Sequence, residues 1–435
     1  MKYILSFVFA FLLLSRAGAQ VLVHQEYRKR VILYNQDVKA AGERKEAASL
    51  AVKSARTNML PFLSANGSAS YQFFPPPIQV GDVFSINQEG WSIFTDLSLM
   101  QPVYAGGAIS AQNNIAAIQE RIAGLDEHNT IENTLLAADA YYWNFSASQE
   151  ILDISNTFYG LVDQLYTVVN ARFEDGLVSR NDLIMVETRK KEAEFQVLAA
   201  KRNFEIALQA LNIFMGAEAN LPAIADSIRN SSTPPDPVPV ADALNARFEY
   251  QISLNAIGIA QENVRLTAAG FNPNLSIGLQ ETFGTKPLNT DNSFIFNTFA
   301  LARINIPLFE WNNRRYQVSQ ARLNVGIREL ENARLVDEIV LQINQALTNL
   351  ELSRQQTELA QEGLQIATEN LDLNYFSYYE GRLPILDVLS AQMSWAGAQS
   401  NLVSANLQYK LALSEYQKAA GLMYVEYQAL MDSEQ

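Results

Sequence analysis

The heptapeptide QPVYAGG at residues 101–107 returns as IPLFEWN at residues 306–312, and the offset between the two copies is 205 residues. The same offset relates three further pairs: Gly176 and Gly381, Asp182 and Asp387, and Gly216 and Gly421. Residues 102–216 and 307–421 are therefore one unit written twice. A duplication of this length predicts one architecture built from two quasi-equivalent halves.

Residues 1–19 have the composition of a secretory signal peptide. Lys2 precedes an apolar stretch from Tyr3 to Leu14, and Ala17-Gly18-Ala19 has the form of a cleavage site, so Gln20 is the expected mature N-terminus. The alternative is a membrane anchor, but a spanning helix needs about 20 apolar residues, more than this stretch provides. The sequence therefore predicts an exported protein.

The 435-residue chain contains no cysteine and has a formal net charge of −14. Without cysteine it forms no disulfides, thiolate metal sites or cysteine nucleophile. An acidic chain is also a poor binder of nucleic acid, because phosphate contacts need Lys and Arg. After the signal no apolar run reaches about 18 residues, so any crossing of a membrane must use strands.

Four segments alternate apolar and polar residues with the period of a β-strand: residues 62–74, 91–101, 273–283 and 294–306. A soluble sheet with one solvated face would alternate in the same way. Aromatic residues at both ends of the segments instead favour membrane strands between two interfacial belts. These residues are Phe73, Phe74, Trp91, Phe283 and Phe294 near the hairpin tips, and Tyr104, Phe309 and Trp311 near the bases.

A sheet of four strands cannot close on itself, since about eight strands is the smallest barrel seen. An open edge in lipid would leave backbone groups unpaired, so the chain is expected to oligomerise. Two copies would give a filled 8-strand barrel, and three copies a 12-strand barrel with a lumen. The strand pattern leaves both possibilities open.

Long helical hairpins are expected over about 105–216 and 312–421. Apolar residues recur there at spacings of three and four, as in Ile151, Ile154 and Phe158, which predicts a coiled-coil seam. Each hairpin reverses at a short glycine turn, residues 174–179 and 379–384. A compact soluble bundle is the alternative, but helices of roughly 70 residues exceed what such a bundle needs.

These patterns divide the chain into two repeats. The first covers residues 20–228, with helices before its strands, and the second covers residues 241–435, with a helix, two strands, the hairpin and a short C-terminal segment. The proline-rich residues 229–240 link them.

The chain resembles the TolC-like outer membrane efflux protein family. The resemblance combines the signal peptide, the four strands, the aromatic belts and the two helical hairpins. The resemblance rests on the joins at 101–107 and 306–312 and on the glycine turns followed by Asp182 and Asp387. It implies an α+β membrane protein, a homotrimer whose 12-strand β-barrel in outer-membrane lipid continues into a 12-helix periplasmic tunnel. The implied function is the exit duct of a tripartite efflux or type I secretion system, working with a periplasmic adaptor and an inner-membrane pump, without cofactor or metal.

The same resemblance implies two sets of site residues. The adaptor would dock on the hairpin turns, at Gly176, Leu177, Val178, Ser179, Gly381, Arg382, Leu383 and Pro384. An acidic ring at the pore constriction maps to Asp387, while its second acidic position falls on Ser390 and a neighbouring basic position on Leu383. Asp182 is the counterpart of Asp387, but Ser179-x-x-Asp182 also has the spacing of a capping box. A role at the pore constriction and a role as a helix cap both remain open for Asp182 and Asp387.

Two other classes of protein fit the sequence less well. An enzyme needs a reactive site, yet the chain has only His24 and His128, which we interpret as surface or packing residues, and none of the common catalytic motifs. A periplasmic coiled-coil spacer would share the heptads but would not need alternating strands between aromatic belts. The sequence favours an outer-membrane duct over both.

Overall fold

The structure is a computed structural model that describes residues 20–80, 84–219, 221–229, 235–286 and 289–432. The expected signal peptide and residues 230–234 of the expected linker lie outside this range. The chain divides into a first unit of Met1–Gly42, Asp126–Tyr250 and Leu335–Gln435, and a second unit of Glu43–Leu125 and Gln251–Arg334. Each unit therefore draws on both sequence repeats.

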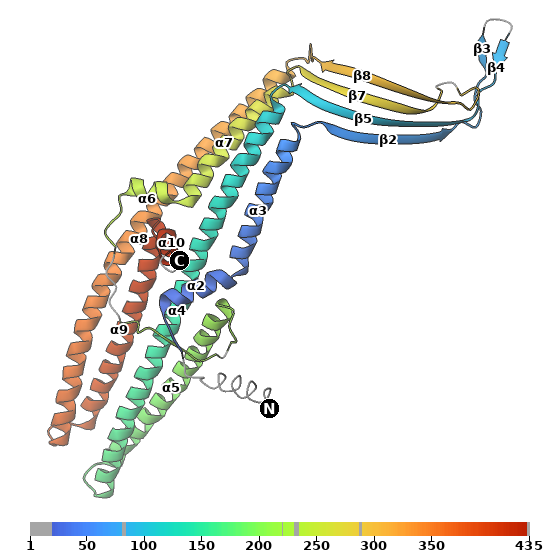
Figure 1. Ribbon diagram of the computed structural model, residues 1–435. Helices are drawn as coiled ribbons and strands as arrows, with labels where there is room; N and C mark the ends of the chain where they lie inside the picture. Colours follow the sequence, from blue (N-terminus) through green and yellow to red (C-terminus); the bar gives the residue numbers. More distant parts are fainter. Residues whose placement is uncertain (1–19, 81–83, 220, 230–234, 287–288, 433–435) are drawn as a thin grey trace, which may run out of the picture. The chain divides into compact units, whose positions relative to one another are not determined.

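A four-stranded antiparallel sheet dominates the second unit (Figure 1), with the strand order β2-β5-β7-β8. Its strands are β2 (Phe62–Tyr71), β5 (Trp91–Ala105), β7 (Asn274–Thr285) and β8 (Phe294–Asn305). The four expected strands are present, although β2 ends earlier and β5 continues further than the sequence pattern suggests. Among the described strands, β2 and β8 each pair on one side only, so the sheet has two open edges.

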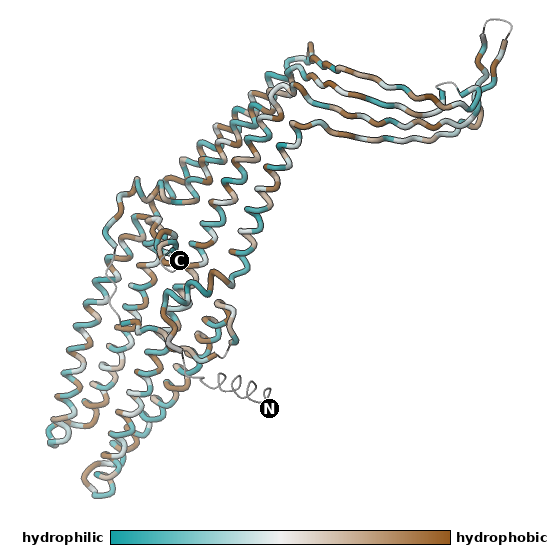
Figure 2. The backbone as a smooth tube through the Cα atoms, in the orientation of Figure 1, coloured by the Kyte–Doolittle hydropathy of each residue, from teal (hydrophilic) through white to brown (hydrophobic). Residues whose placement is uncertain are grey.

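The register of the sheet places most apolar side chains on one face and most polar side chains on the other. Leu63 lies opposite Leu99, and Leu99 lies opposite Leu279. On the other face the hydroxyls of Ser64 and Ser98 are 2.8 Å apart. The alternation is visible as brown and teal bands along the strands (Figure 2). The apolar face is exposed: Leu63, Leu99 and Leu279 are 65%, 39% and 54% exposed, unlike the buried face of a soluble sheet.

Four helices meet this sheet at one end, because the strands are antiparallel and each joins its helix there. They are α3 (Gln36–Thr57) before β2, α4 (Ala108–Glu174) after β5, α7 (Phe248–Ala269) before β7 and α8 (Asn313–Tyr379) after β8. The duplication is preserved in their lengths, since α3 and α7 have 22 residues each and α4 and α8 have 67.

At the other end of the sheet, the β2–β5 loop contains a small hairpin of β3 (Ile78–Val80) and β4 (Phe84–Ile86) that the sequence pattern did not predict. The two loops of the sheet are bonded together. Glu89 N–H donates to the Asn289 carbonyl at 2.7 Å, and the Asn289 side chain donates to the Trp91 carbonyl at 2.9 Å.

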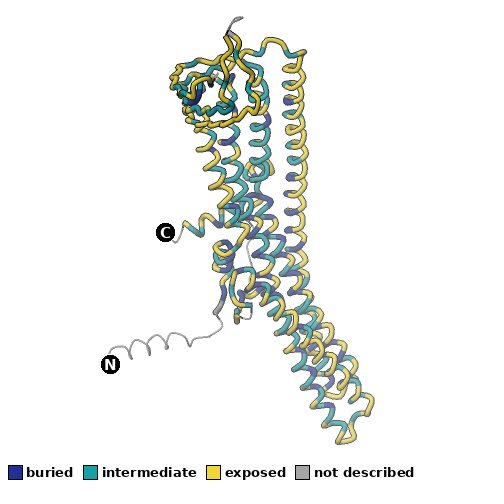
Figure 3. The backbone as a smooth tube through the Cα atoms, turned by 90° about the vertical axis from the view of Figure 1, so that its right-hand side faces the viewer, coloured by how far each residue is buried: buried dark blue, intermediate teal, exposed yellow. Residues whose placement is uncertain are grey.

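The first unit is helical, and most of its core lies between helices (Figure 3). It contains the remaining parts of α4 and α8 and, among the described residues, five shorter helices. It also contains a parallel pair of short strands, β1 (Gln20–Leu22) and β6 (Ala223–Ala225). The five are α2 (His24–Tyr34), α5 (Arg180–Phe214), α6 (Val240–Ala246), α9 (Ile385–Ala419) and α10 (Met423–Asp432). None of the helices in the described residues is both long and apolar enough to cross a membrane.

Candidate functional site

The two hairpin turns share one backbone conformation. After α4, Gly176 has φ 71° and Leu177 N–H donates to the Arg172 carbonyl at 2.8 Å. After α8, Gly381 also has φ 71° and Arg382 N–H donates to the Ser377 carbonyl at 2.9 Å. This is the Schellman ending, whose left-handed residue is normally glycine. Most turn side chains are exposed, Leu177 at 73%, whereas Val178 and Leu383 are half-buried.

The two equivalent aspartates have different surroundings. Asp182 belongs to a capping box: its carboxylate accepts from the Ser179 backbone N–H at 3.2 Å and hydroxyl at 2.9 Å, while its own N–H donates to the Ser179 hydroxyl at 3.2 Å. Pro384 replaces this serine in the second copy and has neither the hydroxyl nor the N–H. The half-buried Asp387 carboxylate makes no hydrogen bond or ion pair to another described residue. Ser390, one turn further along α9, is exposed.

The structure brings the two hairpins together just behind their turns. One buried cluster contains Leu165 and Val186 of the first hairpin and Ile385 and Val388 of the second. Arg172 of α4 also donates to the Tyr379 carbonyl at 3.3 Å, and its guanidinium lies 4.9 Å from the centre of the Tyr378 ring. The sequence pattern did not identify Arg172, because its contact depends on how two distant segments meet.

The aromatic residues predicted to form the belts lie at opposite ends of the sheet. At the loop end, the Phe283 ring lies 5.2 Å from Phe294, and Trp91 lies 6.1 Å from Phe294. Phe73 and Phe74 follow β2 and are 79% and 91% exposed. At the helix end, Phe309 and Trp311 form an edge-on pair at 4.9 Å, and Tyr104 is 51% exposed.

Two features of the apolar face were missed by the sequence pattern. A register shift between Pro102 and Tyr104 pairs Tyr104 with Leu275, which carries Tyr104 onto the apolar face despite its even number. Glu281 also lies on this face, opposite Leu97 and Thr298, and its carboxylate accepts from the Thr298 hydroxyl at 2.6 Å. The alternating pattern did not reveal Glu281, because one charged residue among apolar positions hardly changes a pattern of period two.

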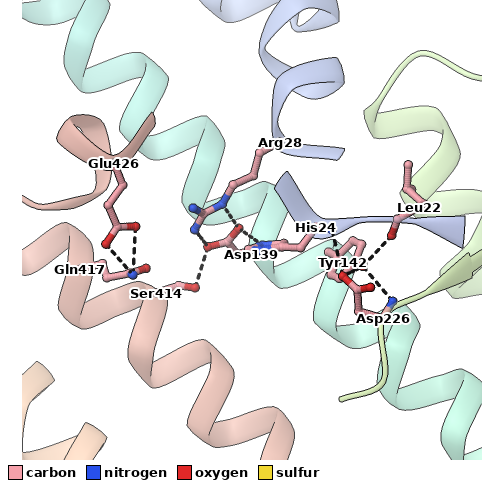
Figure 4. A network of polar contacts seen from close by, with 9 residues as sticks. All are labelled: Leu22, His24, Arg28, Asp139, Tyr142, Asp226, Ser414, Gln417 and Glu426. Atoms are coloured by element: carbon pink, nitrogen blue, oxygen red, sulfur yellow. Dashed lines mark hydrogen bonds and ion pairs between the residues drawn. The ribbon is translucent and has the colours of Figure 1, made fainter. Parts of the chain in front are cut away.

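A buried ionic network holds the N-terminal segment in the first unit (Figure 4). The fully buried Asp139 carboxylate accepts from Arg28 Nε at 2.6 Å, from the same guanidinium's Nη2, and from the Ser414 hydroxyl at 2.6 Å; His24 Nε2 lies 2.7 Å away. Burial raises the pKa of Asp139, but the Arg28 charge and the hydrogen bonds from Arg28 and His24 outweigh it and hold that pKa well below its usual range.

A second set of contacts fixes the β1–β6 pair beside this network. The Tyr142 hydroxyl lies 2.7 Å from the Leu22 carbonyl and 2.9 Å from the Asp226 carboxylate, and it accepts from Asp226 N–H at 2.9 Å (Figure 4). The Ser146 hydroxyl donates to the Asp226 carbonyl at 2.6 Å. His24, interpreted from the sequence as a surface or packing residue, is thus a structural hydrogen-bonding residue.

Another charged cluster forms where α4, α6, α9 and α10 approach one another. Glu132, 1% exposed, accepts from Tyr424 N–H at 3.3 Å, and burial raises its pKa to about 7 despite nearby Arg247 and Lys418. His128 stacks on Tyr424 at 4.5 Å. Within the described ranges, no group of three or more His, Asp or Glu residues could hold a metal ion.

Comparison with known proteins agrees with this geometry. The model of the family "Outer membrane efflux protein" matches residues 28–217 and 243–422. The chain is 22% identical over 329 residues to outer membrane efflux protein BepC of Brucella suis, which covers 75% of this chain and 72% of BepC. It is 23% identical over 405 residues to Nodulation protein T of Rhizobium leguminosarum, covering 87% and 81%.

Solved channels have the same fold. The outer membrane channel CmeC of Campylobacter jejuni superposes with a TM-score of 0.79 at 18% identity, over 94% of this chain and 89% of CmeC. A structure of CusC gives a TM-score of 0.78 at 16% identity, over 91% of each chain. The sheet with two open edges, its exposed apolar face and the two helical hairpins are those of a TolC-like channel. The chain belongs to the outer membrane efflux protein family and is an exit duct in the outer membrane that extends into the periplasm.

Proposed function

We propose that three copies of this chain form one closed duct, acting passively rather than as an enzyme. The observation that carries the proposal is the pair of open edges, β2 and β8, on a sheet with an exposed apolar face. In lipid each edge must find a partner, and pairing β8 of one chain with β2 of the next satisfies both. Three chains then supply twelve strands around a lumen, lined by the polar face with Ser64 and Ser98.

In the same proposal, the hairpin turns receive a periplasmic adaptor, which couples the duct to an inner-membrane pump. Two observations support this role. The turns expose Leu177, a large apolar side chain, and Arg382, whose nearest ion-pair partner is Glu380 at 3.6 Å. Their Schellman hydrogen bonds hold both turns in the same backbone conformation, and a preformed conformation reduces the ordering cost of binding.

Asp387 is proposed to line the pore constriction, with Ser390 beside it. The contact of Arg172 with Tyr378 and Tyr379 is proposed to hold the two hairpins of a protomer together. Asp387 is favoured because its carboxylate has no partner among the described residues, whereas Asp182 is occupied as a cap. Three symmetry-related carboxylates near one axis would attract cations.

The test is cation selectivity of the purified protein in planar bilayers, measured as the reversal potential in a salt gradient. Asp387→Ala should lower the preference for cations, and Ser390→Asp, which adds a second acidic ring, should raise it. Asp182→Ala is the matched control: it should leave selectivity unchanged and destabilise the helix start by about 1 kcal/mol. Equal selectivity of Asp387→Ala and the natural protein would remove Asp387 from the pore.

A further inference from the structure

Basic side chains gather at the strand-to-helix joins of the second unit, in a chain whose net charge is −14. Arg314, Arg315 and Arg322 lie in the first turns of α8, and Lys53 and Arg56 in the last turns of α3. All are exposed, and none forms a hydrogen bond or ion pair with another residue that the structure describes. Both helices reach the same end of the sheet.

The three arginines line one open surface hollow of about 470 Å³. Its other lining residues are Ala268, Asn312, Val318 and Ser319. Arg315, Ser319 and Arg322 are spaced so that they share one side of the helix. A guanidinium presents several N–H donors in a plane, the geometry that binds phosphate oxygens in pairs.

Two of these arginines do not stabilise α8 itself. Arg314 and Arg315 lie in its first turn, where the positive macrodipole makes cations unfavourable, and α8 has no acidic residue there to offset them. The Glu310 carboxylate, just before the helix, accepts a hydrogen bond from the Asn313 side chain at 3.4 Å. Nor does the duplication require them, because the equivalent residues of the first copy are Ile109, Ser110 and Ala117. An external ligand explains the cluster better than the fold does.

Exposed aromatic residues place the hollow at the depth of lipid headgroups. Trp311 and Phe309 directly precede the arginines and are 82% and 73% exposed. Tryptophan concentrates where hydrocarbon meets water, and basic residues flank it on the headgroup side. The outer-membrane location of the sheet puts this end at the periplasmic leaflet.

We propose that this hollow binds the phosphate of an anionic phospholipid headgroup in the periplasmic leaflet. The inference rests on the proposed trimeric duct, which sets the sheet in lipid. In the proposed trimer a second copy of the chain lies beside the hollow, but charge argues against that copy filling it. Pairing β8 with β2 of the next protomer brings α8 beside α3, and the α3 end there carries Lys53 and Arg56. Like charges on both sides repel each other and together attract an anion.

The test uses the full chain in phosphatidylethanolamine nanodiscs that contain a small fraction of phosphatidylglycerol with brominated acyl chains. Bromine quenches tryptophan fluorescence at contact, and Trp311 adjoins the hollow. Phosphatidylglycerol should quench more than brominated phosphatidylcholine at equal fraction. The variant R314Q/R315Q/R322Q should lose at least about tenfold in apparent affinity, since each basic residue near a surface is worth roughly fivefold. Trp311→Phe should remove the selective signal.

Controls separate this inference from the function on which it rests. R328Q/K201Q/R202Q removes the same charge elsewhere and should retain selective quenching, and R322Q alone should show a partial loss. Natural trimers that conduct ions but are quenched equally by both lipids would overturn the inference and leave the duct intact. Tight binding of inorganic phosphate to the natural protein in detergent, lost in R314Q/R315Q/R322Q and accompanied by equal quenching by both lipids, would also overturn it, by revealing a free-phosphate site. A chain that forms no trimer would instead overturn the proposed duct.

Discussion

Single residues show where the duplicated copies have diverged. At the first strand-to-helix join, Gly106 and Gly107 have φ of 66° and 97°, a conformation that glycine adopts without strain. At the second join, Trp311 and Asn312 adopt φ of 52° and 65°, although they carry side chains. Tryptophan at such a φ is strained by about 1–3 kcal/mol, and retaining it there is consistent with an interfacial role.

The buried Asp139 network of the first unit likewise has no equivalent in the second copy. Asp139 of α4 holds Arg28 and Ser414, whereas its counterpart Asn344 in α8 is exposed and donates only to the Val340 carbonyl at 2.9 Å. Breaking a buried ion pair on one side typically costs about 3–5 kcal/mol. The N-terminal segment is therefore fixed by one site that the duplication did not copy.

Glu132 gives a prediction for pH dependence. Its pKa is about 7 in the folded chain against an ordinary 4.5, so the folded state holds a proton that the unfolded state releases between these values. Stability should then fall as pH rises through this window. Glu132→Gln should raise the free energy of unfolding at pH 8 by on the order of 1–3 kcal/mol and change little at pH 4.

Thermal melting of Glu132→Gln and the natural protein at both pH values measures this difference. Glu187→Gln, at an exposed position of α5, is the matched control and should have no effect at either pH. A gain from Glu132→Gln that is equal at pH 4 and pH 8 would rule out titration of this carboxyl.

At the scale of elements, the register of β7 assigns its two faces to different surroundings. Leu279 lies on the apolar face opposite Leu99, and the adjacent Gln280 lies on the polar face opposite Ser98. Leu279→Arg should destabilise the protein in the membrane by about 2–4 kcal/mol, because arginine would face hydrocarbon. Gln280→Arg introduces the same side chain toward the lumen and should cost far less. Urea unfolding from vesicles compares the two, and equal losses would mean that the faces are misassigned.

The strands and long helices could be predicted from the sequence because they depend on local periodicity. Alternation located β2, β5, β7 and β8, and proline-free heptads located α4 and α8. The β3–β4 hairpin was missed because each of its strands has three residues, too few for a period to show. Contacts such as Arg172 with Tyr379 and Arg28 with Asp139 join residues 207 and 111 positions apart, and no local pattern encodes such pairs.

At the scale of the whole molecule, the exposed side of α8 supports assembly with other copies. Leu352, Leu359, Ile366 and Leu373 recur every seven residues and are 51%, 67%, 68% and 58% exposed. A regular heptad seam of this kind is used to pack against another helix. Soluble monomers rarely leave so long an apolar stripe in water, so a neighbouring protomer is the partner that the proposed trimer supplies.

Ile366→Asp should therefore weaken the trimer, because it places a charge in the middle of this seam. Burial of an isoleucine contributes about 1.5–3 kcal/mol, and the threefold symmetry repeats the loss at each of three interfaces. Gln365→Asp adds the same charge on the adjacent, exposed side chain and should leave the trimer intact. Trimer and monomer fractions in detergent, followed by native mass spectrometry across a dilution series, measure the difference. If Ile366→Asp and Gln365→Asp dissociate at the same concentration, the seam faces solvent and the trimer must be held by the strands alone.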